Sequence, residues 1–378
     1  MANGLAPYLL NDMKSMAGGA YAGTRIDLKG FLAMLVAGPG AAPIQANTLT
    51  GNKKEIRFWY RQRNLKAQVA SGNQGSPLTT GSTAFCGKLL TPARLETTIA
   101  VNNTQEIAFH LSDELVASYT EEAAQRMQNP GVPFSGGATN EMMDIIMSGA
   151  NGILSAINQD LLTNLLTWGK NKVTGTNTAT TLNIAQAAGT VLTGGMPKLI
   201  GDYKQNNLSG MPNVVGSGLF LNYILSQPYK GLDSAGMNSQ LATGMINFFP
   251  DQDFDSVVGS NQIGVFEPGS IQLAEYLEFT GFKAGVKPGD SEFGVLVLPA
   301  FDSMGNAIPI KLDYQLRYLS CATTLTDLYS GNSTTFPKGW SLILKKDYGL
   351  FQTPSDAYYA SDANRSVNGA LRYSVTNS

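Results

Sequence analysis

Charged residues are scarce in this chain. Asp, Glu, Lys and Arg make up 14% of its 378 residues, against about 25% in ordinary soluble proteins. The hydrophobic fraction of 43% is ordinary, so the missing charge is missing from the surface. Because the cores of protein interfaces are depleted in charge, this composition favours a chain that covers much of its exterior with copies of itself. The alternative is a neutral extracellular β protein rich in Ser, Thr and Asn.

Cysteine and histidine are scarce as well. Cys86 and Cys321 are the two cysteines, and they form no C-x-x-C pattern, which favours a reducing compartment and no metal framework. His110 is the single histidine, and we interpret it as structural because it lies in a strand-like run. A Ser-His-Asp triad is hard to build from this composition, and no catalytic pair stands out among the 28 acidic residues. We expect no enzyme, and no catalytic, cofactor-binding or metal-binding residue.

Two short motifs resemble ligand loops but lack essential residues. The Gly-Lys pair at 87–88 is followed by Leu89, where a phosphate-binding loop needs Ser or Thr to hold magnesium. The D-x-D-x-D sequence at 251–255 opens like a calcium loop, yet Ser256 replaces the turn glycine and Gln262 the bidentate glutamate. We reject the first motif and interpret the second as an acidic solvated loop.

Long apolar runs are missing too. The longest, Phe31 to Ile44, has about 14 residues and is interrupted by Gly and Pro, whereas a membrane helix needs about 20. The first residues lack a cationic start followed by an apolar core, so we expect no secretion signal and a chain that stays in the cytoplasm. A formal charge of −2 speaks against tight, sequence-independent nucleic-acid binding by the whole surface.

The longest helical pattern is Asn140 to Trp168. Its apolar residues recur mostly at four-residue steps, which places them on one stripe of an α-helix. About 28 residues at about 1.5 Å each predict a rod of about 42 Å, a spine rather than an ordinary domain helix. Asn140 is the expected N-cap. Gly149 and Gly152 are expected to bend the helix or break it in two.

A basic segment with strand periodicity precedes this spine. Residues 53–66 hold six basic residues and one acid. After a tip rich in Gly, Ser and Thr at 70–83, the chain returns through 85–99. The pattern predicts a long hairpin that a single domain could not easily cover on both sides.

One face of this hairpin is a candidate contact surface. Side chains alternate along a strand, so Arg57, Trp59, Arg61 and Arg63 share a face. We expect these four residues, with Lys66, to contact a neighbouring subunit. The alternatives are a plain solvated strand face and a stacking platform for single-stranded nucleic acid.

The other segments predict a mixed architecture. Ser112 begins a helix that runs to about Met127. Short helices and apolar strands alternate between residues 182 and 303, as in a mixed α/β unit. Residues 307–320 and 339–351 are two long alternating strands.

Four sequence segments, in this order, carry a family resemblance. They are LETTIAV at 95–101, LSDEL at 111–115, DLLTNLLTWG at 160–169 and LKKDYGLF at 344–351. With the polar arm and the basic hairpin before them, they give a layout that resembles the major capsid protein of tailed double-stranded-DNA bacteriophages, the family with the Hong Kong 97-like fold.

The resemblance implies an α+β, Hong Kong 97-like capsid fold with a mixed α/β axial domain. An extended β-hairpin loop would lie over a neighbouring subunit, and a peripheral domain would contain the long spine helix. The implied divisions are an N-terminal arm and first strand (1–51), the extended loop (52–94), the peripheral domain (95–175, returning at 304–353), the axial domain (176–303) and a C-terminal tail (354–378).

The implied function is that of a bacteriophage structural protein. Copies would self-assemble as pentamers and hexamers of an icosahedral shell, in the host cytoplasm, and enclose double-stranded DNA in the virion. Implied partners are scaffold and portal proteins, decoration proteins in some members, and packaged DNA contacted non-specifically. We predict no covalent cross-link, because no trio of Lys, Asn and Glu stands out. The alternatives are an encapsulin-like bacterial nanocompartment shell protein and a cell-surface β-rich binding protein.

Overall fold

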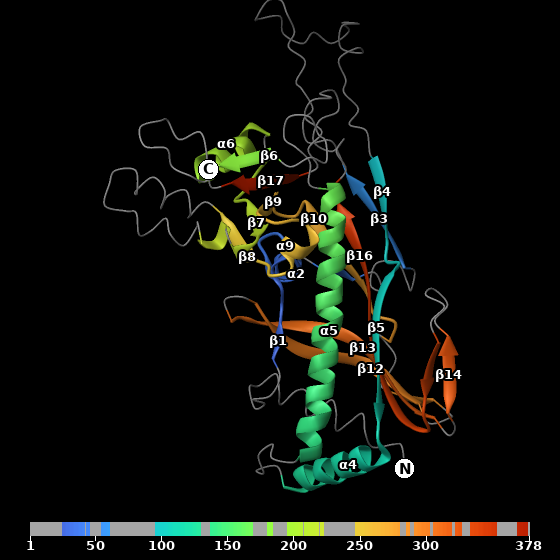
Figure 1. The fold of residues 1–378 in the computed structure, drawn as a ribbon. Coiled ribbons are helices and arrows are strands. Elements are labelled where there is room, and N and C mark those ends of the chain that lie inside the picture. The colour runs from blue at the N-terminus through green and yellow to red at the C-terminus, as the bar shows by residue number, and fades with distance from the viewer. Residues whose placement is uncertain are drawn as a thin grey trace, which may run out of the picture.

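The computed structural model of the chain contains two main sheets and a long helix (Figure 1). Over the residues that the structure describes, the expected α+β class is confirmed. Residues 1–24 and the tip of the basic hairpin are not among them. The described residues are 25–41, 43–45, 54–60, 95–129, 137–168, 180–183, 195–206, 208–218, 220–222, 246–279, 285–287, 291–302, 305–319, 322–326, 333–353 and 369–376.

The larger sheet has eight strands, with β16 (Gly339–Gln352) at its centre. β13 and β10 pair with successive halves of one edge of β16, and β5 pairs with the other edge. β12 continues the sheet beyond β13, and the remaining three strands lie at its margins. The predicted long strands at 307–320 and 339–351 are confirmed as β13 and β16. The other members are β1 (Ile26–Asp27), β2 (Ile44–Gln45), β5 (Asn103–Leu111), β10 (Ile271–Tyr276), β11 (Gly285–Lys287), β12 (Ser291–Phe301) and β13 (Ala307–Leu319).

The predicted spine is a single helix, α5 (Gly137–Trp168), of 32 residues. Figure 1 shows it running along the length of the molecule beside the larger sheet. It continues through Gly149 and Gly152, so the expected break is wrong. A Cβ atom on Gly149 would lie 2.6 Å from Phe109 Cε2 and 2.8 Å from Leu344 Cδ1. Glycine at this position therefore lets the helix approach the sheet closely.

The start of α5 is capped by another helix, α4 (Asp113–Gln128). Because α5 begins at Gly137, the expected N-cap at Asn140 is wrong. The Glu122 carboxylate on α4 instead accepts hydrogen bonds from the N–H groups of Ala138 and Thr139, at 3.2 and 2.9 Å. Burial alone would raise the pKa of Glu122, but these hydrogen bonds outweigh it and lower the pKa.

The apolar run at 31–36, within the range predicted to hold the arm and first strand, forms a helix, α2 (Gly30–Ala37). A short apolar run does not distinguish a buried strand from a buried helix. Two buried side chains bind the first N–H groups of α2. Asp251 Oδ2 accepts from Phe31 N–H at 2.9 Å, and Asn158 Oδ1 accepts from Leu32 N–H at 3.1 Å.

The second sheet has five strands in the order β6-β17-β9-β7-β8. The expected polar tail at 354–378 is wrong where β17 (Ala370–Thr376) pairs between β6 and β9. The range 176–303 is not one unit either, because β10 and β12 belong to the larger sheet. The remaining elements of this part are β6 (Thr180–Asn183), α6 (Gly195–Gln205), β7 (Asn213–Gly216), β8 (Asn247–Pro250), α9 (Phe254–Val257) and β9 (Gln262–Phe266).

Two smaller strand pairs complete the described structure. β14 (Thr323–Thr326) pairs with β15 (Ser333–Phe336), and β3 (Glu55–Tyr60) pairs with β4 (Leu95–Ala100). Among the described residues, no helix combines the length and hydrophobicity required to cross a bilayer. The same residues contain no group of three or more His, Cys, Asp or Glu side chains that could hold a metal ion.

Candidate assembly surface

The base of the predicted basic hairpin is a two-stranded ribbon formed by β3 and β4. The strands are antiparallel and pair from Glu55 opposite Ala100 to Tyr60 opposite Leu95. Figure 1 places this ribbon near the C-terminal end of α5, whereas α4 lies at the other end of that helix. The ribbon therefore extends from one end of the molecule, and we call it the β3–β4 ribbon below.

Only one part of the ribbon joins a hydrophobic cluster among the described residues. Ile56 and Ile99, which face each other across the ribbon, pack with Val101, Ala274 and Tyr276. Alternate side chains point away from this cluster, because neighbours along a strand face opposite sides. One face of the ribbon is thus anchored on the sheet, whereas the described side chains of the other face are exposed; these are Glu55, Arg57, Glu96, Thr98 and Ala100.

Arg57 lies on the open face of the ribbon. Its side chain is 71% exposed, and its Nε atom is 3.7 Å from the Glu96 carboxylate, whose side chain is 35% exposed. Exposed pairs of this kind contribute at most about 1 kcal/mol, so Arg57 remains available to another molecule. For Trp59 the structure describes the backbone alone, in β3, and Arg61, Arg63 and Lys66 lie outside the described residues. Their contact role stays a prediction.

A charged cluster that no sequence motif predicted anchors the ribbon. Lys54, directly before β3, donates from Nζ to Asp347 Oδ2 at 2.7 Å. The Asp347 side chain is fully buried, and its Oδ1 atom accepts from Thr104 Oγ1 at 2.6 Å. Lys345 Nζ lies 3.6 Å from the same carboxylate. The ribbon and the sheet are therefore joined through a buried charge. The sequence signal that could have indicated this cluster is the run 345–347, in which every residue is charged.

Asp313 on β13 belongs to the same face of the sheet. It pairs directly opposite Lys345, and its carboxylate accepts from the N–H groups of Glu278 and Phe279 at 2.7 and 3.2 Å. Burial raises the pKa of Asp313 to about 6, and the charge of Asp347 adds to the increase, although the two N–H groups and Lys345 oppose it. The ionised form of Asp313 therefore destabilises the folded chain relative to its protonated form.

The raised pKa of Asp313 predicts that the free energy of unfolding depends on pH. The pKa of an aspartate in an unfolded chain is about 3.9, so between pH 4 and pH 6 the folded chain holds the Asp313 proton more tightly. The contribution of Asp313 to the free energy of unfolding should therefore fall as pH rises through this window, by about 2 to 3 kcal/mol. Urea unfolding of the native chain and of Asp313→Asn, at pH 7 and at pH 4.5, measures this pH dependence. The native chain should gain about 2 kcal/mol relative to the variant at the lower pH, whereas parallel pH profiles would contradict the assignment.

A second ion pair is buried on the opposite face of the sheet. Lys346 Nζ is 2.7 Å from Glu275 Oε1, and the two side chains are 1% and 8% exposed. The same face carries Tyr348, whose hydroxyl donates to Asp160 of α5 at 2.7 Å. Burial is the main cause that raises the pKa of Tyr348, which keeps the hydroxyl as a donor. These contacts fix β16 against the spine.

The motif at 251–255 is not a solvated acidic loop throughout, which corrects that interpretation. Asp251 is buried, and besides the α2 contact its Oδ2 atom accepts from Asn158 Nδ2 at 3.0 Å. Its Oδ1 atom accepts from the N–H of Asp253 at 2.9 Å, and Asp253 pairs with Lys29 at 2.6 Å. This cluster joins α2, α5 and the segment after β8. It has a structural role.

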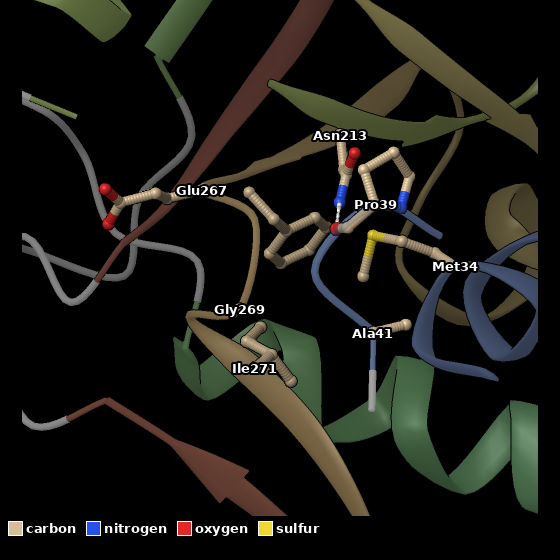
Figure 2. Close-up of a pocket in the computed structure, with 8 residues that line it drawn as sticks. Met34, Pro39, Ala41, Asn213, Glu267, Gly269 and Ile271 are labelled. Carbon is tan, nitrogen blue, oxygen red and sulfur yellow. Dashed lines mark hydrogen bonds between the residues drawn. The ribbon is translucent and has the colours of Figure 1, made fainter. Parts of the chain in front are cut away.

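A small pocket lies where the end of α2 meets β7 and the turn between β9 and β10 (Figure 2). Asn213 Nδ2 donates to the carbonyl of Pro39 at 3.2 Å across it. Glu267 is the charged residue among those that line the pocket, and it accepts hydrogen bonds from the N–H and the hydroxyl of Ser209. The pocket is therefore a narrow space between packed elements, and its polar groups are hydrogen-bonded within the chain. It is lined by Met34, Pro39, Ala41, Asn213, Phe266, Glu267, Gly269 and Ile271.

No protein-family model and no curated protein matches this sequence. Among solved structures, the chain is similar to one from Mycobacterium phage Adephagia, with 11% identity, a TM-score of 0.46, and coverage of 94% of this chain and 92% of that chain. It is also similar to the cyanophage A-1(L) capsid asymmetric unit, with 12% identity, a TM-score of 0.42 and 94% coverage of both chains. A structure of Mycobacterium phage Bobi matches with 11% identity, a TM-score of 0.46, and coverage of 94% and 93%. These low identities and TM-scores leave the function to be inferred from the geometry of this chain.

Proposed function

We infer that this chain is the major capsid protein of a tailed double-stranded-DNA bacteriophage. Its copies would assemble as pentamers and hexamers into a closed icosahedral shell around the genome. The observation that carries this inference is the β3–β4 ribbon, which extends from the end of the sheet beside α5 with one face anchored and the other exposed. The exposed face can be buried only against another molecule, and such burial would stabilise the ribbon, because a two-stranded ribbon gains little stability from its own pairing in water.

Two further features support assembly over life as a monomer. The low fraction of charged residues, 14%, suits a surface that neighbouring copies cover. The buried charges are paired within the described structure instead: Asp347 pairs with Lys54, and Lys346 pairs with Glu275. We propose that Arg57 on the open face, together with Trp59, Arg61, Arg63 and Lys66, contacts the neighbouring subunit.

The proposed subdivision follows from this role. The larger sheet with α4 and α5 would form the peripheral part of the subunit, and the five-stranded sheet with α6 would form the axial part near the centre of each pentamer or hexamer. Scaffold, portal and decoration proteins, and packaged DNA contacted non-specifically, are the further partners that we propose. The location would be the virion, after assembly in the host cytoplasm, and the role is structural.

Electron microscopy of the purified full chain tests the assembly. We expect closed particles, rings of five or six subunits, or sheets built from them. A chain that stays monomeric at high concentration would overturn the proposal. DNA recovered from particles made in infected cells would support the viral role, whereas particles that enclose a folded protein cargo would support a nanocompartment.

Charge reversal of the three arginines proposed for this contact tests it. The triple variant Arg57→Glu, Arg61→Glu, Arg63→Glu should remain soluble and folded but form no closed shells, because like charges would face the surface that the arginines contact. Particle yield in negative-stain images is the measurement, with circular dichroism as the check on folding. The matched control replaces the same arginines with lysine, which keeps the charge and should retain shells. Normal particles from the glutamate variant would remove the contact role.

A further inference from the structure

We propose that Asp347 is a positioning residue: through its ion pair with Lys54, it sets the direction in which the β3–β4 ribbon leaves the sheet. This inference rests on the proposed function, in which the ribbon reaches a neighbouring copy. It assigns the ribbon's orientation to a buried residue that lies outside the contact surface itself.

The hydrophobic contacts at the base hold the ribbon near the sheet but do not fix its angle. Ile56, Ile99 and Val101 pack against Ala274 and Tyr276, and hydrophobic attraction is non-directional. A charged hydrogen bond is directional, since it weakens steeply when its geometry departs from linear. The ion pair between Lys54 and Asp347 is such a bond, and it joins the residue directly before β3 to the central strand.

The Asp347 carboxylate is itself held in one orientation. Thr104 on β5 donates to Oδ1 at 2.6 Å, which leaves Oδ2 for Lys54 at 2.7 Å. Because the side chain is fully buried, its charge needs a close partner. Lys54 is therefore drawn to one place. The backbone transmits this constraint to the ribbon, since the Lys54 carbonyl accepts from the N–H of Val101 at 2.8 Å.

The neighbouring charges leave this pair intact. Asp313 accepts from the N–H groups of Glu278 and Phe279. Lys345, which lies between the two aspartates, donates to Glu278 at 2.9 Å and stays 3.6 Å from Asp347. The Lys54 ammonium also lies 5.3 Å from the centre of the Tyr276 ring, a favourable cation–π distance. Glu106 on β5 pairs opposite Lys345 on this face.

Hydrogen exchange of the purified full chain tests the proposal. Lys54 is the better target than Asp347, because its side chain is 47% exposed and Lys54→Met leaves the sheet's own residues unchanged. We expect amides of residues 55–60 and 95–100 to exchange about tenfold faster in Lys54→Met, since they then open without the ion pair. Amides of β13 should keep their native rates. Lys54→Arg retains the charge and should keep the ribbon within about threefold of native exchange.

A matched control removes a charge that does not touch the ribbon. Glu278→Gln breaks the pair with Lys345 in the same cluster and should leave ribbon exchange unchanged. If Lys54→Met exchanges like the native chain, or if Glu278→Gln loosens the ribbon equally, the positioning role of Asp347 is wrong. Microscopy of the same samples separates the two proposals. If Lys54→Met exchanges faster but neither the native chain nor any variant forms particles, the capsid function is contradicted and the positioning role of Asp347 is supported.

Discussion

Replacing Asp251 with alanine is expected to lower the free energy of unfolding by about 4 kcal/mol, because three hydrogen bonds to a buried carboxylate are lost together. Both carboxylate oxygens accept hydrogen bonds, from Phe31, Asn158 and Asp253. Alanine has no side-chain acceptor for any of these donors. The start of α2 and the middle of α5 would then each have an unpaired polar group.

Urea unfolding of the full chain, followed by far-UV circular dichroism, measures this loss. The matched control is Asp255→Ala in the same segment, where the carboxylate is exposed and accepts one long hydrogen bond, from Asn261 N–H at 3.3 Å. That change should stay within about 0.5 kcal/mol, as surface substitutions usually do. Equal effects of the two substitutions would show that Asp251 is not the joint between α2 and α5.

Elements with a strong local pattern were predictable. The four-residue period of the spine gave α5 with the same last residue, Trp168, and Ser112 caps α4 as expected, accepting from Leu115 N–H at 3.1 Å. The period-two pattern gave β13 and β16 within one residue. These signals are local, because each depends on residues within one or two turns or along one strand.

Elements that depend on distant partners were not predictable. The cap of α5 comes from Glu122, a side chain of another helix. β17 reads as part of a polar tail until β6 and β9 pair with its two edges. Gly149 of α5 was expected to break the helix, because the side chain that requires a glycine there, Phe109, belongs to another element. Sheet membership of β10 and β12 has the same cause, since the order of strands is not written in any one strand.

The candidate surface also has a part that local sequence patterns predict and a part that depends on distant residues. The alternation of aromatic and basic residues predicted the ribbon, and β3 pairs with β4 as a hairpin requires. The contact role of Arg57 and its neighbours stays a prediction, because it concerns a second molecule. The anchor formed by Lys54, Asp347 and Thr104 joins residues separated by 243 and 293 positions in the chain. No sequence pattern brings such residues together, whereas buried charge in the structure identifies them at once.

Replacing Gly349 with alanine is expected to detach the base of the ribbon and to lower the free energy of unfolding by about 3 kcal/mol, as overpacking in a rigid site does. A Cβ atom at this position would press on the Ala100 carbonyl oxygen and lie 3.1 Å from its carbon and from Val101 Cα. These are backbone atoms, so no side-chain rotation relieves the contact. The chain must instead move the junction between β4 and β5 away from β16.

Gly152→Ala is the matched control, since its Cβ atom would have Ile107 Cδ1 at 3.9 Å as its nearest neighbour and should stabilise the helix by about 0.5 to 1 kcal/mol. Urea unfolding gives the stability of each variant, hydrogen exchange at 95–100 reports the ribbon, and microscopy counts particles. The expected result for Gly349→Ala is a loss in all three, because a displaced ribbon no longer meets its neighbour. Native exchange and native particles from this variant would show that the contact between Gly349 and Ala100 does not hold the ribbon, and that β16 tolerates a side chain there by moving alone.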